Sequence, residues 1–257
     1  MNSSKKIIIL ILIFNFHFSV SQNLKELNIK YIHKGVFSSL NDSKGTLIIN
    51  PNISIYTLSP NNKEREESEM DLESMSFNIT IPLEEDLFFI KDIKKNKLTS
   101  KENIFTKTFV VKDSIPKISW KIYDEEKTVA NTFKCKKAIG KFRGRIYTAW
   151  FTPKIPISNG PWKLGGLPGL ILEAYDEKKE IIFEFVSLTQ SSNNISLIKV
   201  LKSIETKKAI DWEEYKTLFR KKMKHFNSSL KSSSSGDTEI NVTKINLIEK
   251  SILEDEK

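Results

Sequence analysis

Apolar and polar residues alternate with a period of two over several short segments of this chain. Residues 53–58 show this alternation, residues 46–49 are a β-branched and apolar run, and Asn50-Pro51-Asn52 separates the two segments. Because successive side chains of a strand point to opposite faces, this pattern predicts two strands. Asn and Pro favour turns, so the two strands should form a β-hairpin.

Further short segments rich in apolar or β-branched residues follow, at 77–81, 86–90, 105–112, 117–123, 128–135, 170–175 and 180–189, with a turn predicted at 124–126. Most connections between them are too short for the helical crossovers that parallel strands need. We therefore predict a mainly β protein built on a single large curved antiparallel sheet, either a half-barrel or a meander.

Residues 207–227 have a different period. Apolar side chains recur there at intervals of three or four, with Glu and Lys between them: Trp212, Tyr215, Phe219, Met223 and Phe226. This spacing predicts an amphipathic helix packed on the sheet, and a helix on a membrane surface is the alternative. A Ser-rich loop at 228–236 should end it.

The N-terminus has the order of a secretory signal peptide over residues 1–21. Lys5 and Lys6 precede an apolar run at 7–14, and cleavage is expected after Ser21. The run is well short of the roughly 20 residues that span a bilayer, which favours cleavage over the alternative, an uncleaved membrane anchor. We expect an exported chain with no transmembrane segment once mature, one domain over 22–250 and a charged tail at 251–257.

The chain is basic, with a formal charge of +9, but its basic residues do not indicate a nucleic-acid partner. Only four of them are Arg, and the many Lys residues are spread along the chain among 32 acidic residues. No nucleic-acid-binding motif is present. Nucleic acid is therefore excluded from the predicted partners.

Glycine, proline and tryptophan gather in one window, residues 140–169. It holds six of the nine Gly, four of the eight Pro and two of the four Trp. Gly reaches backbone conformations closed to other residues and Pro fixes φ, so this stretch should follow one unusual, fixed path. Pro168 and Gly169 suit the central positions of a type II turn, with φ > 0 at Gly169.

Alternation through this window predicts that Arg143, Arg145, Tyr147 and Phe151 share one strand face. The two arginines are candidates for binding a carboxylate or phosphate, because a guanidinium offers a planar set of donors. The alternative is a structural ion pair with Glu173 or Asp176. Two tryptophans complete the candidate contact residues, Trp150 and Trp162, and Trp162 is either a ligand-stacking indole or a buried plug over the sheet.

The motifs of this window resemble those of the GLPGLI family of secreted Bacteroidetes proteins. The hexapeptide that names the family is complete at Gly166-Leu167-Pro168-Gly169-Leu170-Ile171. Further matches make up the rest of the resemblance over 45–189, among them Cys135-Lys136-Lys137-Ala138, Arg143-Gly144-Arg145 and Gly160-Pro161-Trp162. Ile245-Asn246-Leu247-Ile248-Glu249 is a weaker match to the family's C-terminal pattern. A departure lies at Asn131-Thr132-Phe133, where the family usually has a glycine and an aromatic residue before the cysteine.

The resemblance implies a secreted or periplasmic β-rich protein of a Gram-negative bacterium, from a family without an established activity. The chain is also similar to the N-terminal module that precedes the catalytic part of some bacterial peptide:N-glycanases, which implies an accessory role. No catalytic residue carries over from either likeness.

Three classes of function follow. An enzyme lacks obvious parts, since the predicted mature chain has two His, no Gly-x-Ser-x-Gly and one Cys, although a carboxylate pair stays open as a hydrolytic alternative. Cys135 is expected to be a buried core thiol rather than a nucleophile. We favour a non-catalytic envelope module that carries an apolar or anionic ligand or docks on an envelope protein, and we predict neither a cofactor nor a bound metal.

Overall fold

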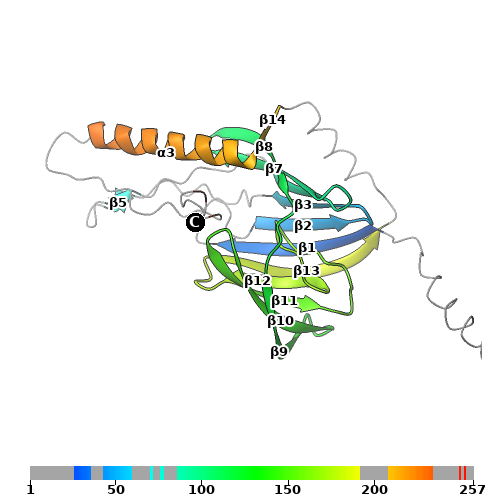
Figure 1. Ribbon diagram of the computed structural model, residues 1–257. Coiled ribbons are helices and arrows are strands. Elements are labelled where there is room, and N and C mark those ends of the chain that lie inside the picture. The colour runs from blue at the N-terminus through cyan, green and yellow to red at the C-terminus, as the bar shows by residue number, and fades with distance from the viewer. Residues whose placement is uncertain are drawn as a thin grey trace, which may run out of the picture.

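The computed structural model describes residues 26–35, 43–59, 70–71, 76–77, 86–191, 208–233, 249 and 252. Within these ranges the fold is mainly β, with one large open sheet of 12 strands and one helix packed on it (Figure 1). The predicted fold class is confirmed. The chain positions that carry the expected signal peptide, 1–21, lie outside the described residues, as does most of the tail.

The strands of the large sheet are β1 (Glu26–Gly35), β2 (Ser43–Ile49), β3 (Ile53–Ser59), β6 (Leu87–Asp92), β7 (Lys97–Ile104), β8 (Lys107–Ser114), β9 (Trp120–Val129), β10 (Phe133–Phe142), β11 (Arg145–Thr152), β12 (Leu170–Asp176), β13 (Ile181–Ser191) and β14 (Ala209–Asp211). Their order in the sheet is β14-β8-β7-β6-β3-β2-β1-β13-β12-β11-β10-β9. All neighbours are antiparallel except β14 and β8, so the sheet is mixed. A separate pair consists of β4 (Met70–Asp71) and β5 (Ser76–Phe77).

The sheet is strongly curved. β6 and β10 lie seven positions apart in its order, which in a flat sheet would separate them by about 34 Å at ~4.8 Å per strand. The ring of Trp162 nevertheless lies 6.5 Å from that of Phe89 on β6 and 5.5 Å from that of Phe142 on β10. One side chain can contact both strands only if the sheet bends around it.

The first hairpin, β2 and β3, forms as predicted. Asn50 Oδ1 accepts hydrogen bonds from the backbone N–H groups of Asn52 and Ile53, which fixes the turn between the strands. Further along, β7 was not predicted, and the predicted strand 105–112 begins at Lys107 because Phe105 has φ 54°. Of the predicted strand 77–81, only Phe77 lies among the described residues.

The turn predicted at 124–126 is wrong, because β9 runs through these residues. The chain reverses instead at Ala130 and Asn131, with φ of 49° and 54°. Two consecutive residues with positive φ fit the right-handed twist of a hairpin. The acidic residues at 124–126 are exposed on a strand at the edge of the sheet, where charged side chains are common.

The predicted helix is confirmed as α3 (Trp212–Ser233). Its first turn is capped by Asp211, whose Oδ1 accepts a hydrogen bond from the N–H of Glu214 at 2.8 Å. Its apolar face packs on Ile104 and Val111. The helix continues past the predicted end at 227, since Ser228 and Ser229 bond back to carbonyl groups one turn earlier. This described helix is not apolar enough to cross a membrane.

Candidate functional site

The Gly- and Pro-rich segment, residues 153–169, connects β11 to β12, and we call it the signature loop. Trp162 lies at its centre and is 3% exposed. Its indole stacks on Phe183 of β13 with ring centroids 6.3 Å apart, and also contacts Tyr147 of β11. The loop therefore fills the inner face of the curved sheet, and the buried-plug interpretation of Trp162 agrees with this geometry.

A buried lysine on β6 forms hydrogen bonds with the middle of the signature loop. Lys91 is 3% exposed, and its Nζ donates to Asn159 Oδ1 at 2.9 Å, to the carbonyl of Leu164 at 2.5 Å and to that of Gly160 at 3.4 Å. Three acceptors match the three N–H groups of an ammonium, although burial lowers the pKa of Lys91 to about 7. Asn159 is held in turn by Ser54.

The hexapeptide 166–171 contains two glycines with different roles. Gly166 has φ +87°, a conformation that other residues rarely adopt. Gly169 has no positive φ, so the predicted type II turn is wrong. The N–H of Gly169 donates to the carbonyl of Leu167 at 2.8 Å, which makes a tighter, three-residue turn around Pro168.

Gly169 is required for a different reason, a close approach between two backbone segments. A Cβ at this position would lie 2.3 Å from the carbonyl oxygen of Thr152. Gly160 is similar, since its Cβ would lie 2.9 Å from Cβ of Ile171. Pro161 and Leu167 are buried, and Leu170 and Ile171 begin β12, where the hydroxyl of Tyr31 donates to the carbonyl of Ile171 at 2.8 Å.

The two candidate arginines do not share a strand face. Arg143 and Gly144, with φ of 50° and 76°, form the turn between β10 and β11, so the alternation predicted through Arg143 is wrong. Arg143 Nη2 lies 2.5 Å from Asp113 Oδ2 on β8, and its guanidinium lies 4.0 Å from the ring centroid of Trp212. This ion pair joins β8 to the hairpin at the far side of the curved sheet.

Arg145 is the first residue of β11 and is 3% exposed. Its Nη1 lies 2.6 Å from Asp176 Oδ2 and 2.5 Å from Glu180 Oε2, while Asp176 Oδ1 accepts the N–H of Ile181. These contacts fix the turn between β12 and β13. The geometry agrees with a structural ion pair with Asp176, whereas the other acid considered, Glu173, contacts Lys127 instead.

The remaining candidate contact residues are also covered. Tyr147 is fully buried, burial raises the pKa of its hydroxyl, and this hydroxyl has no hydrogen-bond partner among the described residues. Trp150 is 8% exposed and lies under the ammonium of Lys127, 4.6 Å from the ring centroid. Cys135 is buried, and burial raises the pKa of its thiol to about 12, as a core thiol requires.

A buried ionic cluster lies next to Trp162 and was not predicted. Lys163 is 1% exposed and its Nζ contacts Glu249 and, at 2.8 Å, Glu102 Oε1 of β7. Burial alone would lower the pKa of Lys163, but the two carboxylates raise it above its usual value. Burial raises the pKa of Glu249, against the opposing effect of Lys163. Glu249 is the last residue of the weak C-terminal match at 245–249, and that match was the one sequence feature that pointed to Glu249.

Comparisons with known proteins found a family model that matches the region of the signature loop and solved structures with a similar fold. A family model described as "Protein of unknown function (Porph_ging)" matches residues 105–173, which include the whole signature loop. The structure of PNGF-II in space group P21 has a TM-score of 0.50 and 17% identity, over 77% of this chain and 34% of that one. PNGF-II in space group C2 has a TM-score of 0.49 and 16% identity, over 77% and 33%.

This chain therefore spans about a third of the length of PNGF-II, and at this identity the likeness shows the fold alone. No curated protein is significantly similar in sequence. Membership of the GLPGLI family stays a prediction.

Proposed function

We propose that this protein is a non-catalytic binding module of the cell envelope, exported by its N-terminal segment, and that it docks on its target through its outer surface. The observation that supports this most is the position of the signature loop. Trp162, Leu164 and Leu167 fill the inner face of the sheet, each at most 3% exposed. The residues that make the sequence distinctive therefore serve to build a rigid scaffold.

The filled inner face favours docking over carriage. A carrier holds an apolar ligand in a cavity lined mainly by hydrophobic side chains. Along the described part of the sheet, the place for such a ligand is taken by the chain itself, with Trp162 in ring contact with four aromatic side chains: Phe89, Phe142, Tyr147 and Phe183. An accessory role also fits the similarity between this sequence and the N-terminal module of some peptide:N-glycanases.

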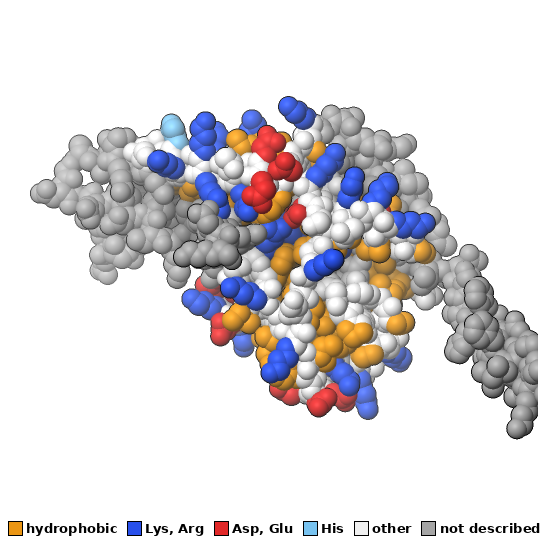
Figure 2. All heavy atoms as spheres, in the orientation of Figure 1, with side chains coloured by type: hydrophobic (Ala, Val, Ile, Leu, Met, Phe, Trp, Pro, Cys, Tyr) orange, Lys and Arg blue, Asp and Glu red, His pale blue; other side chains and the backbone are white. Residues whose placement is uncertain are grey.

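The outer surface offers the contacts that docking requires. On the face in Figure 2, Lys and Arg side chains are scattered among neutral and apolar ones and form no continuous basic stripe. Large apolar side chains are exposed on separate strands and loops, among them Ile122 at 46% and Ile146 at 45%. Such mixed surfaces are typical of non-obligate interfaces.

The test is saturable retention on envelope material. The mature protein, labelled at its N-terminal amine, is titrated onto envelopes isolated from its own cells, with an excess of unlabelled protein as competitor. We expect binding that saturates and is displaced by the competitor, and no release of small products. Binding that never saturates, or release of products from the envelopes, would contradict the proposal.

One observation favours the hydrolytic alternative. Glu102 and Glu249 converge on Lys163, and a carboxyl with a raised pKa is what a general acid needs. Both carboxylates are already held by cations of the chain, however, and Arg143 Nε lies 3.4 Å from Glu249 Oε2. If these acids were catalytic, product release from envelopes would occur with the natural protein and stop in Glu102→Gln.

A further inference from the structure

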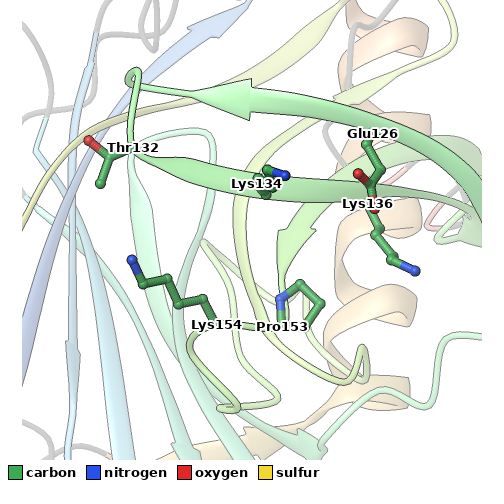
Figure 3. A pocket seen from close by; sticks show the side chains of 6 residues that line it. All are labelled: Glu126, Thr132, Lys134, Lys136, Pro153 and Lys154. Atoms are coloured by element: carbon green, nitrogen blue, oxygen red, sulfur yellow. The ribbon is translucent and has the colours of Figure 1, made fainter.

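A hollow of about 480 Å³ opens between the β9–β10 hairpin and the start of the signature loop. We call it the lysine hollow. Thr132, Lys134 and Lys136 lie on one side of it and Pro153 and Lys154 on the other, as Figure 3 shows, and Glu126 completes the lining. Its volume is within the range of small-ligand sites, about 300–1,000 Å³.

The cations of the lysine hollow carry charge that no ion pair among the described residues neutralises. Within the described residues, Lys134, Lys136 and Lys154 form no ion pair, whereas two other lysines of the same hairpin do, Lys127 with Glu173 and Lys137 with Glu125. With Glu126 as the single acid of the lining, the hollow has an excess of positive charge. Ammonium groups are compact, mobile donors, which suits an anion of variable geometry.

The remaining lining groups narrow the class of anion. Glu126 can only accept hydrogen bonds when ionised, and the hydroxyl of Thr132 donates to the carbonyl of Ala130 and is left to accept, so the ligand should carry donors as well as negative charge. Pro153 is the one apolar residue of the lining, and the aliphatic stems of the lysines add apolar surface that can contact the ring carbons of a ligand. Carboxylates together with hydroxyl groups satisfy all of these side chains.

An extended peptide fits this place less well. β10, which supplies Lys134 and Lys136, is paired with β9 over Phe133–Gly140 and with β11 over Lys136–Phe142. Near the lysine hollow, only the three residues before Lys136 therefore have a side without a ladder partner, too short a stretch for an added strand, the usual mode by which a sheet binds a peptide. Recognition in the lysine hollow must come mainly from side chains.

We propose that the lysine hollow binds an acidic saccharide, a short glycan that carries carboxylate groups. This inference rests on the proposed function, because it names the class of target that the module would recognise. Lys134, Lys136 and Lys154 would contact the carboxylates, and Glu126 and Thr132 would contact hydroxyl groups. The site differs from the candidate contact residues predicted from the sequence: Arg145, Trp150 and Trp162 are buried, and Arg143 is paired with Asp113.

Calorimetric titration of the full protein with trigalacturonate at low ionic strength tests the proposal. Lys134→Ala/Lys154→Ala should weaken binding by about tenfold, which corresponds to about 1.4 kcal/mol, since it removes two charged contacts at exposed lysines. The matched control, Lys121→Ala/Lys141→Ala, removes two exposed lysines of the same hairpin outside the hollow and should change binding by less than about twofold. Thr132→Val removes an acceptor for the ligand's hydroxyl groups and should weaken the binding of trigalacturonate.

Four results would overturn the proposal: no binding of trigalacturonate, equal loss in both double variants, equal binding of neutral maltotriose, or equal binding of triglutamate, which would identify an acidic peptide as the ligand. Each leaves the envelope-retention test intact. Cleavage of trigalacturonate would instead contradict the non-catalytic role while supporting the hollow as a saccharide site.

Discussion

Three glycines of the signature loop should respond differently to the same substitution. Gly165, Gly166 and Gly169 lie within five residues, and each is replaced by Ala in a separate single variant. The added Cβ meets ordinary contacts at Gly165, where the nearest atom is 3.5 Å away. At Gly166 it also meets ordinary contacts, with Trp120 at 3.6 Å, but φ is +87°, and at Gly169 it meets the carbonyl oxygen of Thr152 at 2.3 Å.

These geometries set the expected loss in unfolding free energy. Gly165→Ala should change it by about 0.5 kcal/mol or less, as is usual for substitutions without strain or burial. Gly166→Ala should cost about 1–2 kcal/mol, the typical penalty for a left-handed conformation outside glycine. Gly169→Ala should cost about 3 kcal/mol, because both clashing groups are backbone and β11 and β12, which pair at Thr152 and Leu170, must separate by about 1 Å.

Urea unfolding followed by tryptophan fluorescence measures all three variants against the natural protein, with the slope m checked for a constant denatured state. The expected order of loss is Gly169, then Gly166, then Gly165. If Gly169→Ala were as stable as Gly165→Ala, the close approach of the loop to β11 would be refuted. If Gly166→Ala cost nothing, the strained φ would be refuted.

Other changes test the core, the ion pairs and the buried amine. Trp162→Ala should cost about 3–5 kcal/mol in unfolding free energy, measured in urea, because it leaves a cavity on the inner face of the sheet. Arg145→Lys should lower the melting temperature and cost about 1–3 kcal/mol, since one ammonium cannot replace the guanidinium between Asp176 and Glu180. The thiol of Cys135 should react with a thiol reagent in urea and hardly at all in the native protein. The pKa of Lys91 is about 7 in the folded protein and 10.5 ordinarily, so between these pH values the unfolded chain binds more protons than the folded one. Lys91 therefore makes the free energy of unfolding rise with pH from about 7 to 10.5. In Lys91→Met this rise, measured by urea unfolding at several pH values, should be smaller than in the natural protein.

Local patterns predicted the parts of the fold that local physics decides. The β2–β3 hairpin follows from alternation and a turn-forming Asn, and α3 follows from its apolar spacing. β7 was missed because its sequence, Lys-Leu-Thr-Ser-Lys-Glu-Asn-Ile, is mostly polar, and its partners β6 and β8 make it a strand. The hairpin turn at Ala130 and Asn131 was missed because acidic residues nearby are also common in turns.

The sequence predicted where in the chain the candidate site lies but not which contacts its residues form. The concentration of Gly, Pro and Trp located the signature loop, yet the reason for Gly169 lies in Thr152, and that close approach exists only once β11 and β12 pair. Lys163 meets Glu249 86 residues later, and Tyr31 reaches Ile171 140 residues later. No spacing rule connects such pairs, because the curvature of the sheet brings them together.

The buried charges bear on what the signature loop does. Buried ion pairs add little net stability, because desolvation offsets their attraction, while removal of one partner is costly. Their value here is geometric: Arg143 with Asp113, and Lys163 with Glu102, join the loop side of the sheet to β7 and β8, which lie at the opposite end of the strand order. Apolar contacts are non-directional and would let the two parts of the sheet shift relative to each other. An ion pair between two particular side chains holds them in one relative position. The signature loop thus helps to fix the curvature of the sheet, and the recognition that we propose would fall to surface side chains such as those of the lysine hollow.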